Sequence, residues 1–304
     1  MKKQLLFRIV VSLFVLVGLR GLAEAKTFTI DVLTEFDFPG ATSTHPTAIN
    51  NFNQIVGSFV DVDARTKGFL REANGAFSPA IVEPNDFGLE TFAAGINDPG
   101  VVSGYFTGRG AIFSGFFLSG SSYTEYVVPG AHDTFVTGIN NNGDFAGASS
   151  DGTTGKTQGF INVAGNVTPI LIPRASYMIA NAINNNEQYC GYYRSGGGVH
   201  GFYRDRNGVL QYPVDAPAST TIFYGINDRG WIVGSATDLN ASTTHGVLYI
   251  PPKLFILFDY PGASFTRFDG INNKGMITGD EGDDTFGTHV HGFTARVVLS
   301  PNGD

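Results

Sequence analysis

The chain has 304 residues, a formal net charge of −8 at neutral pH and one cysteine. The negative charge argues against nucleic acid or anionic lipid as a partner, because both require a positive surface. One cysteine cannot form an internal disulfide, so the stability of the fold has to come from its core.

Residues 1–25 have the pattern of a secretory signal peptide. Lys2 and Lys3 form a basic start, and Ala23-Glu24-Ala25 fits a small-x-small cleavage site. The apolar stretch between them is about half of the roughly 20 residues that a membrane-spanning helix needs. We therefore expect a secreted protein, periplasmic or extracellular, without a membrane span. Loss of this segment removes four basic residues and one acidic residue and changes the net charge from −8 to −11.

A short motif recurs six times: a small residue, Ile, Asn, then Asn or Asp, with a Gly eight residues after the Ile. The pairs are Ile49 with Gly57, Ile96 with Gly104, Ile139 with Gly147, Ile183 with Gly191, Ile226 with Gly234, and Ile271 with Gly279. The isoleucines are 47, 43, 44, 43 and 45 residues apart. This period predicts a single repeat domain over residues 26–304 and leaves no room for a separate catalytic domain.

Each repeat contains four short segments rich in β-branched and aromatic residues, separated by Gly, Asn, Asp and Pro. Segments of this kind predict antiparallel strands joined by tight turns. The turn after each Ile requires a residue that tolerates positive φ. That position holds Gly in four repeats, Asn53 in the first and Glu187 in the fourth. We interpret the recurring asparagines as turn residues rather than as a repeated ligand site.

Three further motifs keep the same register. A Gly-Phe pair lies about 20 residues after five of the isoleucines, Gly-Val takes its place in the fifth repeat, and three of the six pairs follow a His: His200, His245 and His291. Pro-Gly-Ala begins at Pro39, Pro129 and Pro261, where one repeat leads into the next. Thr precedes the Ile by five residues in every repeat except the fourth, which has Met178.

These motifs together resemble the HAF family of extracellular repeats, which occurs in secreted bacterial proteins. The resemblance covers about residues 36–299, although the His-Ala-Phe motif of the family reads His-Gly-Phe here and lacks its His in three repeats. It implies an exported, propeller-like repeat protein and no particular activity.

The repeats predict an all-β fold, a six-bladed β-propeller of four-stranded antiparallel blades. A four-stranded sheet cannot bury both of its faces alone, so consecutive repeats have to pack face to face. The segment from Glu35 to Gly40 matches the fourth strand of a repeat, which the sixth repeat lacks. We therefore expect the N-terminal strand to complete the last blade and close a monomeric ring.

Positions two residues before each Ile are candidates for lining the channel of such a propeller. Together with aromatic residues of the variable top-face loops, among them Tyr105 and Tyr192, they suggest a site for a polar ligand. The predicted ligand-binding residues are Asn181, Tyr192, Tyr224, Arg267 and Asp269. A purely structural ion pair between Arg267 and Asp269 is the alternative interpretation.

An acidic segment in the sixth repeat suggests a second site. Asp280, Asp283 and Asp284 would meet Asp61 and Asp63 of the first repeat if the ring closes, and several carboxylates could then hold calcium. The spacing matches no known calcium motif, so a solvated acidic loop is the alternative. No cofactor is required by the sequence, and calcium is possible.

Enzyme signatures such as Gly-x-Ser-x-Gly, His-Glu-x-x-His and phosphate-binding glycine loops do not occur. Cys190 shares its repeat position with small residues, so we interpret it as a buried strand residue rather than a nucleophile. The sequence favours a binding or interaction protein whose top face holds a carbohydrate or a protein. The alternative is a hydrolase or lyase at the channel mouth, with calcium as an optional cofactor, which would require carboxylate, His and Arg side chains to converge.

Overall fold

The computed structural model describes residues 8–9, 26–87, 90–283 and 289–301, and these residues confirm the predicted all-β class. Most of residues 1–25 therefore lie outside the described chain. The strands are β1 (Arg8–Ile9), β2 (Lys26–Phe36), β3 (Ser43–Ile49), β4 (Ile55–Val60), β5 (Thr66–Arg71), β6 (Thr91–Ile96), β7 (Val102–Thr107), β8 (Phe113–Ser119), β9 (Ser122–Tyr126), β10 (Asp133–Ile139), β11 (Phe145–Ser150), β12 (Thr157–Val163), β13 (Asn166–Pro169), β14 (Tyr177–Ile183), β15 (Tyr189–Ser195), β16 (Gly198–Arg204), β17 (Leu210–Val214), β18 (Thr220–Ile226), β19 (Ile232–Asp238), β20 (Thr243–Ile250), β21 (Leu254–Phe258), β22 (Phe265–Ile271), β23 (Met276–Gly282) and β24 (Val290–Pro301). One short 3-10 segment, η1 (Arg109–Ala111), interrupts them. In this part of the chain, no helix is both long enough and apolar enough to cross a membrane.

Consecutive strands of each repeat pair antiparallel in chain order, as in β6-β7-β8-β9. Single parallel pairs join two of these sheets to the next repeat, Thr157 with Tyr177 and Thr244 with Phe265. The first repeat departs from the predicted four strands, because β3-β4-β5 is three-stranded. The described residues of the following segment, 72–87 and 90, pair with that sheet through isolated bridges, such as the one between Gly68 and Ile81. This repeat has the longest spacing, and its extra residues form an irregular segment in place of a fourth strand.

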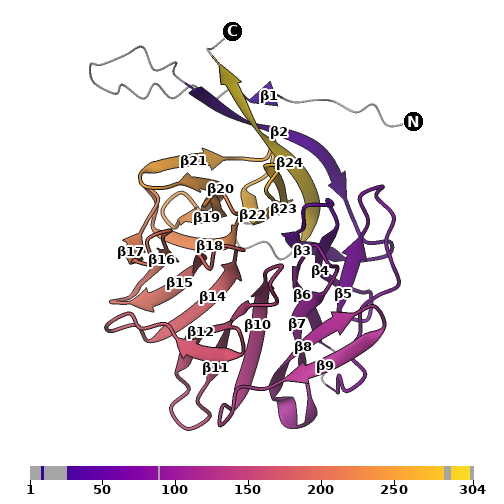
Figure 1. Cartoon of the computed structure of the whole chain (residues 1–304). Coiled ribbons are helices and arrows are strands. Elements are labelled where there is room, and N and C mark those ends of the chain that lie inside the picture. The colour runs from indigo at the N-terminus through magenta and orange to yellow at the C-terminus, as the bar shows by residue number, and fades with distance from the viewer. Residues whose placement is uncertain (1–7, 10–25, 88–89, 284–288, 302–304) are drawn as a thin grey trace.

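The N-terminal strand β2 pairs antiparallel with β24, from Lys26 opposite Pro301 to Phe36 opposite Gly292. This pairing joins the two ends of the described chain, and Figure 1 shows the two strands running together along one side of the molecule. The edge that β24 would otherwise expose is therefore covered over most of its length.

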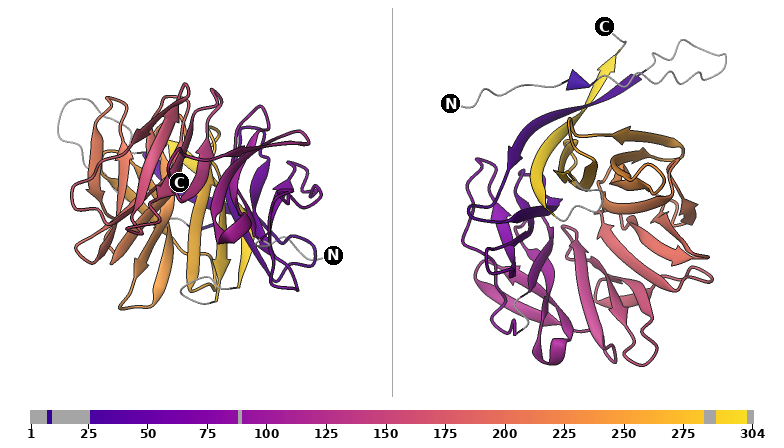
Figure 2. Two further views of the ribbon diagram at one scale, coloured as in Figure 1. Left: turned by 90° about the horizontal axis from the view of Figure 1, so that it is seen from below. Right: turned by 180° about the vertical axis from the view of Figure 1, so that it is seen from behind.

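The repeats are arranged around a common centre, as the two opposite views in Figures 1 and 2 show. A ring of hydrogen bonds follows this arrangement, in which the Asn after each Ile donates its side-chain Nδ2 to the backbone oxygen of the matching Asn in the next repeat. The links run from Asn50 to Asn97, Asn140, Asn184, Asn227, Asn272 and back to Asn50, at 2.8–3.1 Å. The same asparagines also accept backbone N–H groups of their own turns, for example from Gln54. They hold neighbouring repeats together in addition to their predicted role in the turns.

The large residue of each Gly-Phe pair forms the centre of the packing between sheets. Five phenylalanines at this position are at most 2 % exposed: Phe69, Phe116, Phe160, Phe202 and Phe293. Gly before them permits the next repeat to approach, since a Cβ on Gly201 would lie 2.7 Å from the Phe223 ring. Cys190 is fully buried in this layer, and burial raises the pKa of its thiol. Its surroundings agree with the predicted structural role.

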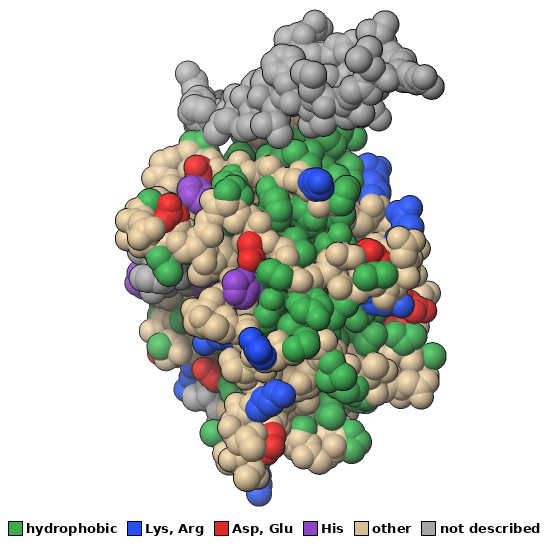
Figure 3. Space-filling view, turned by 90° about the vertical axis from the view of Figure 1, so that its left-hand side faces the viewer, with side chains coloured by type: hydrophobic (Ala, Val, Ile, Leu, Met, Phe, Trp, Pro, Cys, Tyr) green, Lys and Arg blue, Asp and Glu red, His purple; other side chains and the backbone are tan. Residues whose placement is uncertain are grey.

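The recurring Thr and His residues also have structural roles. The five threonines accept a hydrogen bond from the backbone of the segment that enters their repeat, as Thr134 Oγ1 does from Val128 N at 3.0 Å. Each His of the His-Gly motifs pairs with an Asp that precedes a proline by two residues: His200 with Asp215, His245 with Asp259 and His291 with Asp37. Figure 3 shows histidine side chains beside acidic ones on one face of the molecule. The His therefore occurs in the repeats that supply this Asp.

Candidate functional site

A β-bulge interrupts the first strand of every repeat. The register between first and second strands skips one residue each time, and the skipped residues are Thr47, Ala94, Thr137, Asn181, Tyr224 and Asp269. A bulge bends its strand and changes the direction of one side chain. The bulged residues are the positions two before each Ile, from which the sequence predicted the lining of the channel.

The recurring Gly on the second strand makes this bulge possible. A Cβ at any of these six glycines would lie only 2.0–2.1 Å from a carbonyl oxygen of the first strand, for example Phe135 O for Gly147. No side chain fits at that distance, so every repeat requires Gly there. The motif that defines the repeat therefore also determines where its channel residue points.

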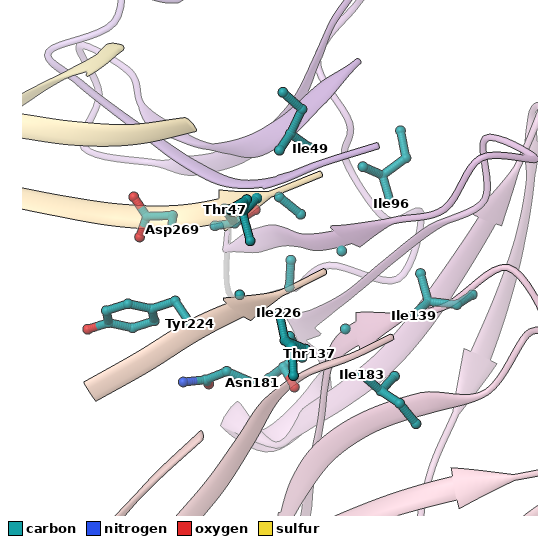
Figure 4. Close-up of a pocket in the computed structure, with 18 residues that line it drawn as sticks. Thr47, Ile49, Ile96, Thr137, Ile139, Asn181, Ile183, Tyr224, Ile226 and Asp269 are labelled. Atoms are coloured by element: carbon teal, nitrogen blue, oxygen red, sulfur yellow. The ribbon is translucent and has the colours of Figure 1, made fainter. Parts of the chain in front are cut away.

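The bulged residues surround a cavity of about 200 Å³ on the axis of the ring. Its lining consists of Thr47, Ala94, Tyr105, Thr137, Asn181, Tyr224, Arg267 and Asp269. Figure 4 shows Tyr224, Asn181 and Asp269 toward one end of the channel, and isoleucines such as Ile96 and Ile139 toward the other. The structure thus brings together four of the five predicted ligand residues.

The fifth predicted residue, Tyr192, is not among the lining residues. Its ring centroid lies 5.9 Å from that of Tyr177. Tyr105 lines the cavity in its place, although the sequence counted it only among the aromatic residues of the top face. Tyr105, Tyr192 and Asp280 occupy the same position on the second strand, nine residues after the Ile, so this column contains the signal that would have identified Tyr105.

Arg267 on β22 is the central charge of the site. Its Nε lies 2.6 Å from Asp269 Oδ1 and its Nη2 lies 2.6 Å from Asp280 Oδ2. The Nε contact is an ion pair without hydrogen-bond alignment, since Nε–H has no well-oriented acceptor among the described residues. Burial opposes the charge of Arg267, but the two carboxylates outweigh it and raise the pKa of the guanidinium. The predicted Arg267–Asp269 pair is therefore part of a larger group that includes Asp280.

Each carboxylate retains one oxygen without a partner. Asp269 Oδ2 and Asp280 Oδ1 are buried and accept no hydrogen bond from any described residue. Asp269 is 3 % exposed and Asp280 is fully buried. Burial raises the pKa of Asp269 well above its usual range, and repulsion from Asp280 adds to the rise although Arg267 opposes it. A buried oxygen without a partner is costly, so Asp269, which lines the cavity, suits a hydrogen-bond donor that enters it.

His45 of the first repeat joins this group through Asp280. Its Nδ1 lies 3.0 Å from Asp280 Oδ2, and its Nε2 lies 3.0 Å from Ser43 Oγ. The order Ser, His, Asp matches a hydrolase triad. Ser43 is buried, however, and its Oγ accepts a hydrogen bond from Val290 N at 3.1 Å. The serine therefore orients the imidazole and is not exposed as a nucleophile.

Aromatic side chains of the second and third repeats pack around Tyr105, which lines the cavity. The Phe92 and Tyr105 rings stack with centroids 4.8 Å apart, and Phe135 meets Tyr105 edge-on at 5.1 Å. Burial raises the pKa of Tyr105 to about 12, so its hydroxyl stays protonated at neutral pH. The charged lining residues, Arg267 and Asp269, come from the sixth repeat, so the cavity combines charged side chains with the ring of Tyr105.

The residues predicted to bind calcium lie in different environments. Asp280 belongs to strand β23 and contacts Arg267, which corrects its predicted position in a loop. Asp61 pairs with Lys67 at 2.8 Å, which lowers the pKa of Asp61 to about 2, and it accepts a hydrogen bond from the backbone of Asp63. Asp283 is exposed, and Asp284 lies outside the described residues. In the described part of the chain, no three His, Cys, Asp or Glu side chains form a group suited to a metal ion.

Comparison with known proteins identifies the fold. No family model matches the chain, and no curated protein matches it. Among solved structures, a gluconolactonase from Xanthomonas campestris has a TM-score of 0.54 at 11 % identity and covers 90 % of both chains. The β-propeller domain of the trilobed protease from Pyrococcus furiosus has a TM-score of 0.51 at 7 % identity, over 86 % of this chain and 100 % of that chain. This chain has a propeller-like fold.

A lectin has the same fold at a similar distance. A variant of the Aleuria aurantia lectin, in complex with Fucα1-6GlcNAc, has a TM-score of 0.50 at 12 % identity, over 86 % of this chain and 97 % of that chain. At these identities the likeness extends to the propeller-like fold alone. Propellers of this kind serve both binding and catalysis, so the function has to be argued from the site.

Proposed function

We propose that the chain binds a carbohydrate in the channel cavity around Asp269. The observation that carries this proposal is a buried acceptor oxygen without a partner, Asp269 Oδ2, in a residue that lines the cavity. Sugar hydroxyls donate hydrogen bonds and would satisfy such an oxygen. A purely structural ion pair with Arg267 would leave this atom unsatisfied.

The opposite wall and the size of the cavity support the same ligand. The C–H face of a sugar ring packs well on aromatic side chains, and Tyr105 supplies both a ring and a hydroxyl. The volume of about 200 Å³ is below the roughly 300–1,000 Å³ that is usual for drug-sized ligands. It therefore suits one sugar residue rather than a long oligosaccharide. The sequence suggested that the top-face loops hold the ligand. The proposed site is confined to the mouth of the channel.

A binding assay with matched variants tests this proposal. The probes are neutral mono- and disaccharides, with Fucα1-6GlcNAc among them, and binding is measured by isothermal titration calorimetry. Asp269→Asn changes one acceptor oxygen, and a hydrogen bond contributes about 0.5–1.5 kcal/mol, so this variant should weaken binding by roughly two- to tenfold. Tyr105→Leu should weaken binding by removing the ring–sugar contact.

The control is Asp61→Asn, which changes a carboxylate outside the cavity and should leave the affinity unchanged. Thermal melting of each variant separates a loss of binding from a loss of folding. Absence of saturable binding by every sugar in the panel would contradict the proposal.

Acid–base catalysis is the second candidate, because the convergence that it requires is present. Arg267, Asp269, Asp280 and His45 lie within one network. Asp269, whose pKa is raised by burial, would supply a proton, and Asp280 would act as the base. The chain would then be a hydrolase or lyase at the channel mouth. Product release from a sugar polymer that disappears in Asp280→Asn, with binding of the monosaccharide retained, distinguishes catalysis from binding alone.

Other features predicted from the sequence extend this proposal. We infer that the six repeats are six blades, because one ring of hydrogen bonds visits all six before it returns to Asn50. We also infer that the protein is exported and is a member of the HAF-type repeat proteins, on the basis of its repeat motifs and of the signal-peptide pattern in residues 1–25. Calcium at the acidic segment that contains Asp283 remains a proposal as well.

A further inference from the structure

A second cavity lies in the second repeat, apart from the channel. It has a volume of about 510 Å³ and is lined by Asn85, Phe87, Phe106, Gly108, Arg109, Ile112, Ser114 and Glu125. This volume is within the roughly 300–1,000 Å³ range of small-molecule sites. Phe106 and the channel residue Tyr105 are neighbours on β7 and point to opposite faces of the sheet, so the two cavities are separate.

The cavity is formed where the chain departs from its repeat. Residues 72–87 stand in place of a fourth strand of the first repeat, and η1 follows β7. Gly110 and Ala111 both have positive φ, at 76° and 59°. Positive φ is unfavourable for Ala, and such backbone strain clusters at functional sites. The backbone next to Arg109 is therefore held in a strained conformation with positive φ.

Two opposite charges line this cavity without an ion pair. Arg109 lies over the Phe87 ring, with Cζ 5.2 Å from its centroid, and forms no salt bridge with the described residues. Glu125 is exposed and has no salt bridge with them either. The neighbouring acids are occupied: Asp86 accepts from Thr91 Oγ1, Glu90 from Thr107 Oγ1 and Glu83 from Asn85 N. Among the described residues at this cavity, Arg109 and Glu125 therefore remain without an ion pair and are available to a ligand.

Apolar surface completes the lining. Phe106 is 1 % exposed, whereas Phe87 and Ile112 are 58 % and 37 % exposed. A ligand that matches all three features has an anionic group, a cationic group and an apolar body. We propose that this cavity binds a short apolar peptide in zwitterionic form, with its carboxylate on Arg109 and its ammonium group on Glu125. This site is independent of the carbohydrate proposed for the channel.

Binding of the dipeptide Leu-Leu, measured by calorimetry and ligand-observed NMR, tests this inference. The N-acetyl form removes the ammonium group and the C-terminal amide removes the carboxylate, so each should bind about tenfold or more weakly, as expected for the loss of a charge-assisted contact. Arg109→Gln should weaken the binding of Leu-Leu and abolish the preference for Leu-Leu over its C-terminal amide. Glu125→Gln should abolish the preference over the N-acetyl form, and Arg109→Lys should restore part of the affinity.

Matched controls make the result specific. Arg229 lies over Trp231 at 5.1 Å, outside this cavity, so Arg229→Gln removes a similar stacked cation and should change nothing. Asp269→Asn alters the channel site and should leave Leu-Leu binding intact, which separates this inference from the carbohydrate proposal. Equal binding of the free, acetylated and amidated dipeptides, or no saturable binding of Leu-Leu to the folded protein, would overturn the inference.

Discussion

Glu281 is the residue whose surroundings give the clearest expectation for how stability depends on pH. It follows Asp280 on β23 and is 8 % exposed. Burial raises the pKa of Glu281 to about 7, and the nearby charge of Glu35 adds to the rise. A carboxyl group whose pKa is higher in the folded state stabilises the protein while it is protonated. This contribution is complete below the unfolded pKa of 4.5 and is lost as the pH rises through about 7.

Replacement of Glu281 by Gln should therefore stabilise the protein at alkaline pH. We expect Glu281→Gln to raise the melting temperature at pH 8 and to have a much smaller effect at pH 4, because the buried charge is absent there. Differential scanning calorimetry across this range measures the difference. Glu187→Gln, at an exposed turn, is the control and should show no such trend. A difference between Glu281→Gln and the unmodified protein that is the same at both pH values would contradict the assignment.

At the scale of one element, the bulged first strand and its partner form a functional unit. The Gly of the second strand admits the bulge, and the bulge turns a side chain toward the channel. The Asn-rich turn that joins the two strands has positive φ in all six repeats, including Asn53 at 62° and Glu187 at 57°. Glu187, which departs from the sequence rule, thus adopts the same backbone conformation as its glycine counterparts.

Gly147→Ala tests the requirement for this bulge. The new Cβ would lie 2.1 Å from Phe135 O, so the two strands have to separate. Overpacking of this kind costs about 1–3 kcal/mol or more. We expect a clearly lower urea midpoint for Gly147→Ala and almost no change for Lys156→Ala, in an exposed loop. The reverse order of the two midpoints would disprove the role of the glycine.

At the scale of the whole molecule, closure of the ring determines which residues meet. His45 and Asp280 are 235 positions apart in the chain, yet His45 Nδ1 lies 3.0 Å from Asp280 Oδ2. Contacts between β23 and β3, and between β22 and β3, place the first repeat against the sixth. The Asn272 to Asn50 hydrogen bond follows the same junction. The contact of His45 with the group formed by Arg267, Asp269 and Asp280 therefore exists only in the closed arrangement.

Loss of strand β2 should weaken this closure. A chain that begins at Asp37 lacks all pairing between β2 and β24, and it should melt at a much lower temperature than one that begins at Lys26. The exposed edge of β24 should also promote association, which size-exclusion chromatography would detect. Equal melting temperatures of the two chains would mean that the N-terminal strand contributes little to closure.

The sequence alone determined the features that depend on short spacings. Its period predicted the strands, and the turn residues predicted the hairpins. The position two residues before each Ile predicted Asn181, Tyr224 and Asp269 as channel residues, because a fixed repeat register places equivalent side chains at equivalent points.

The tertiary structure decided the contacts between distant repeats. Asp280 seemed to belong to an acidic loop, yet it is a buried strand residue that contacts Arg267 and His45. The fourth strand expected in the first repeat is replaced by a segment that lines a cavity with Phe87. Neither result follows from local pattern, because burial, pKa and pairing depend on which side chains the closed ring brings within a few ångströms of one another.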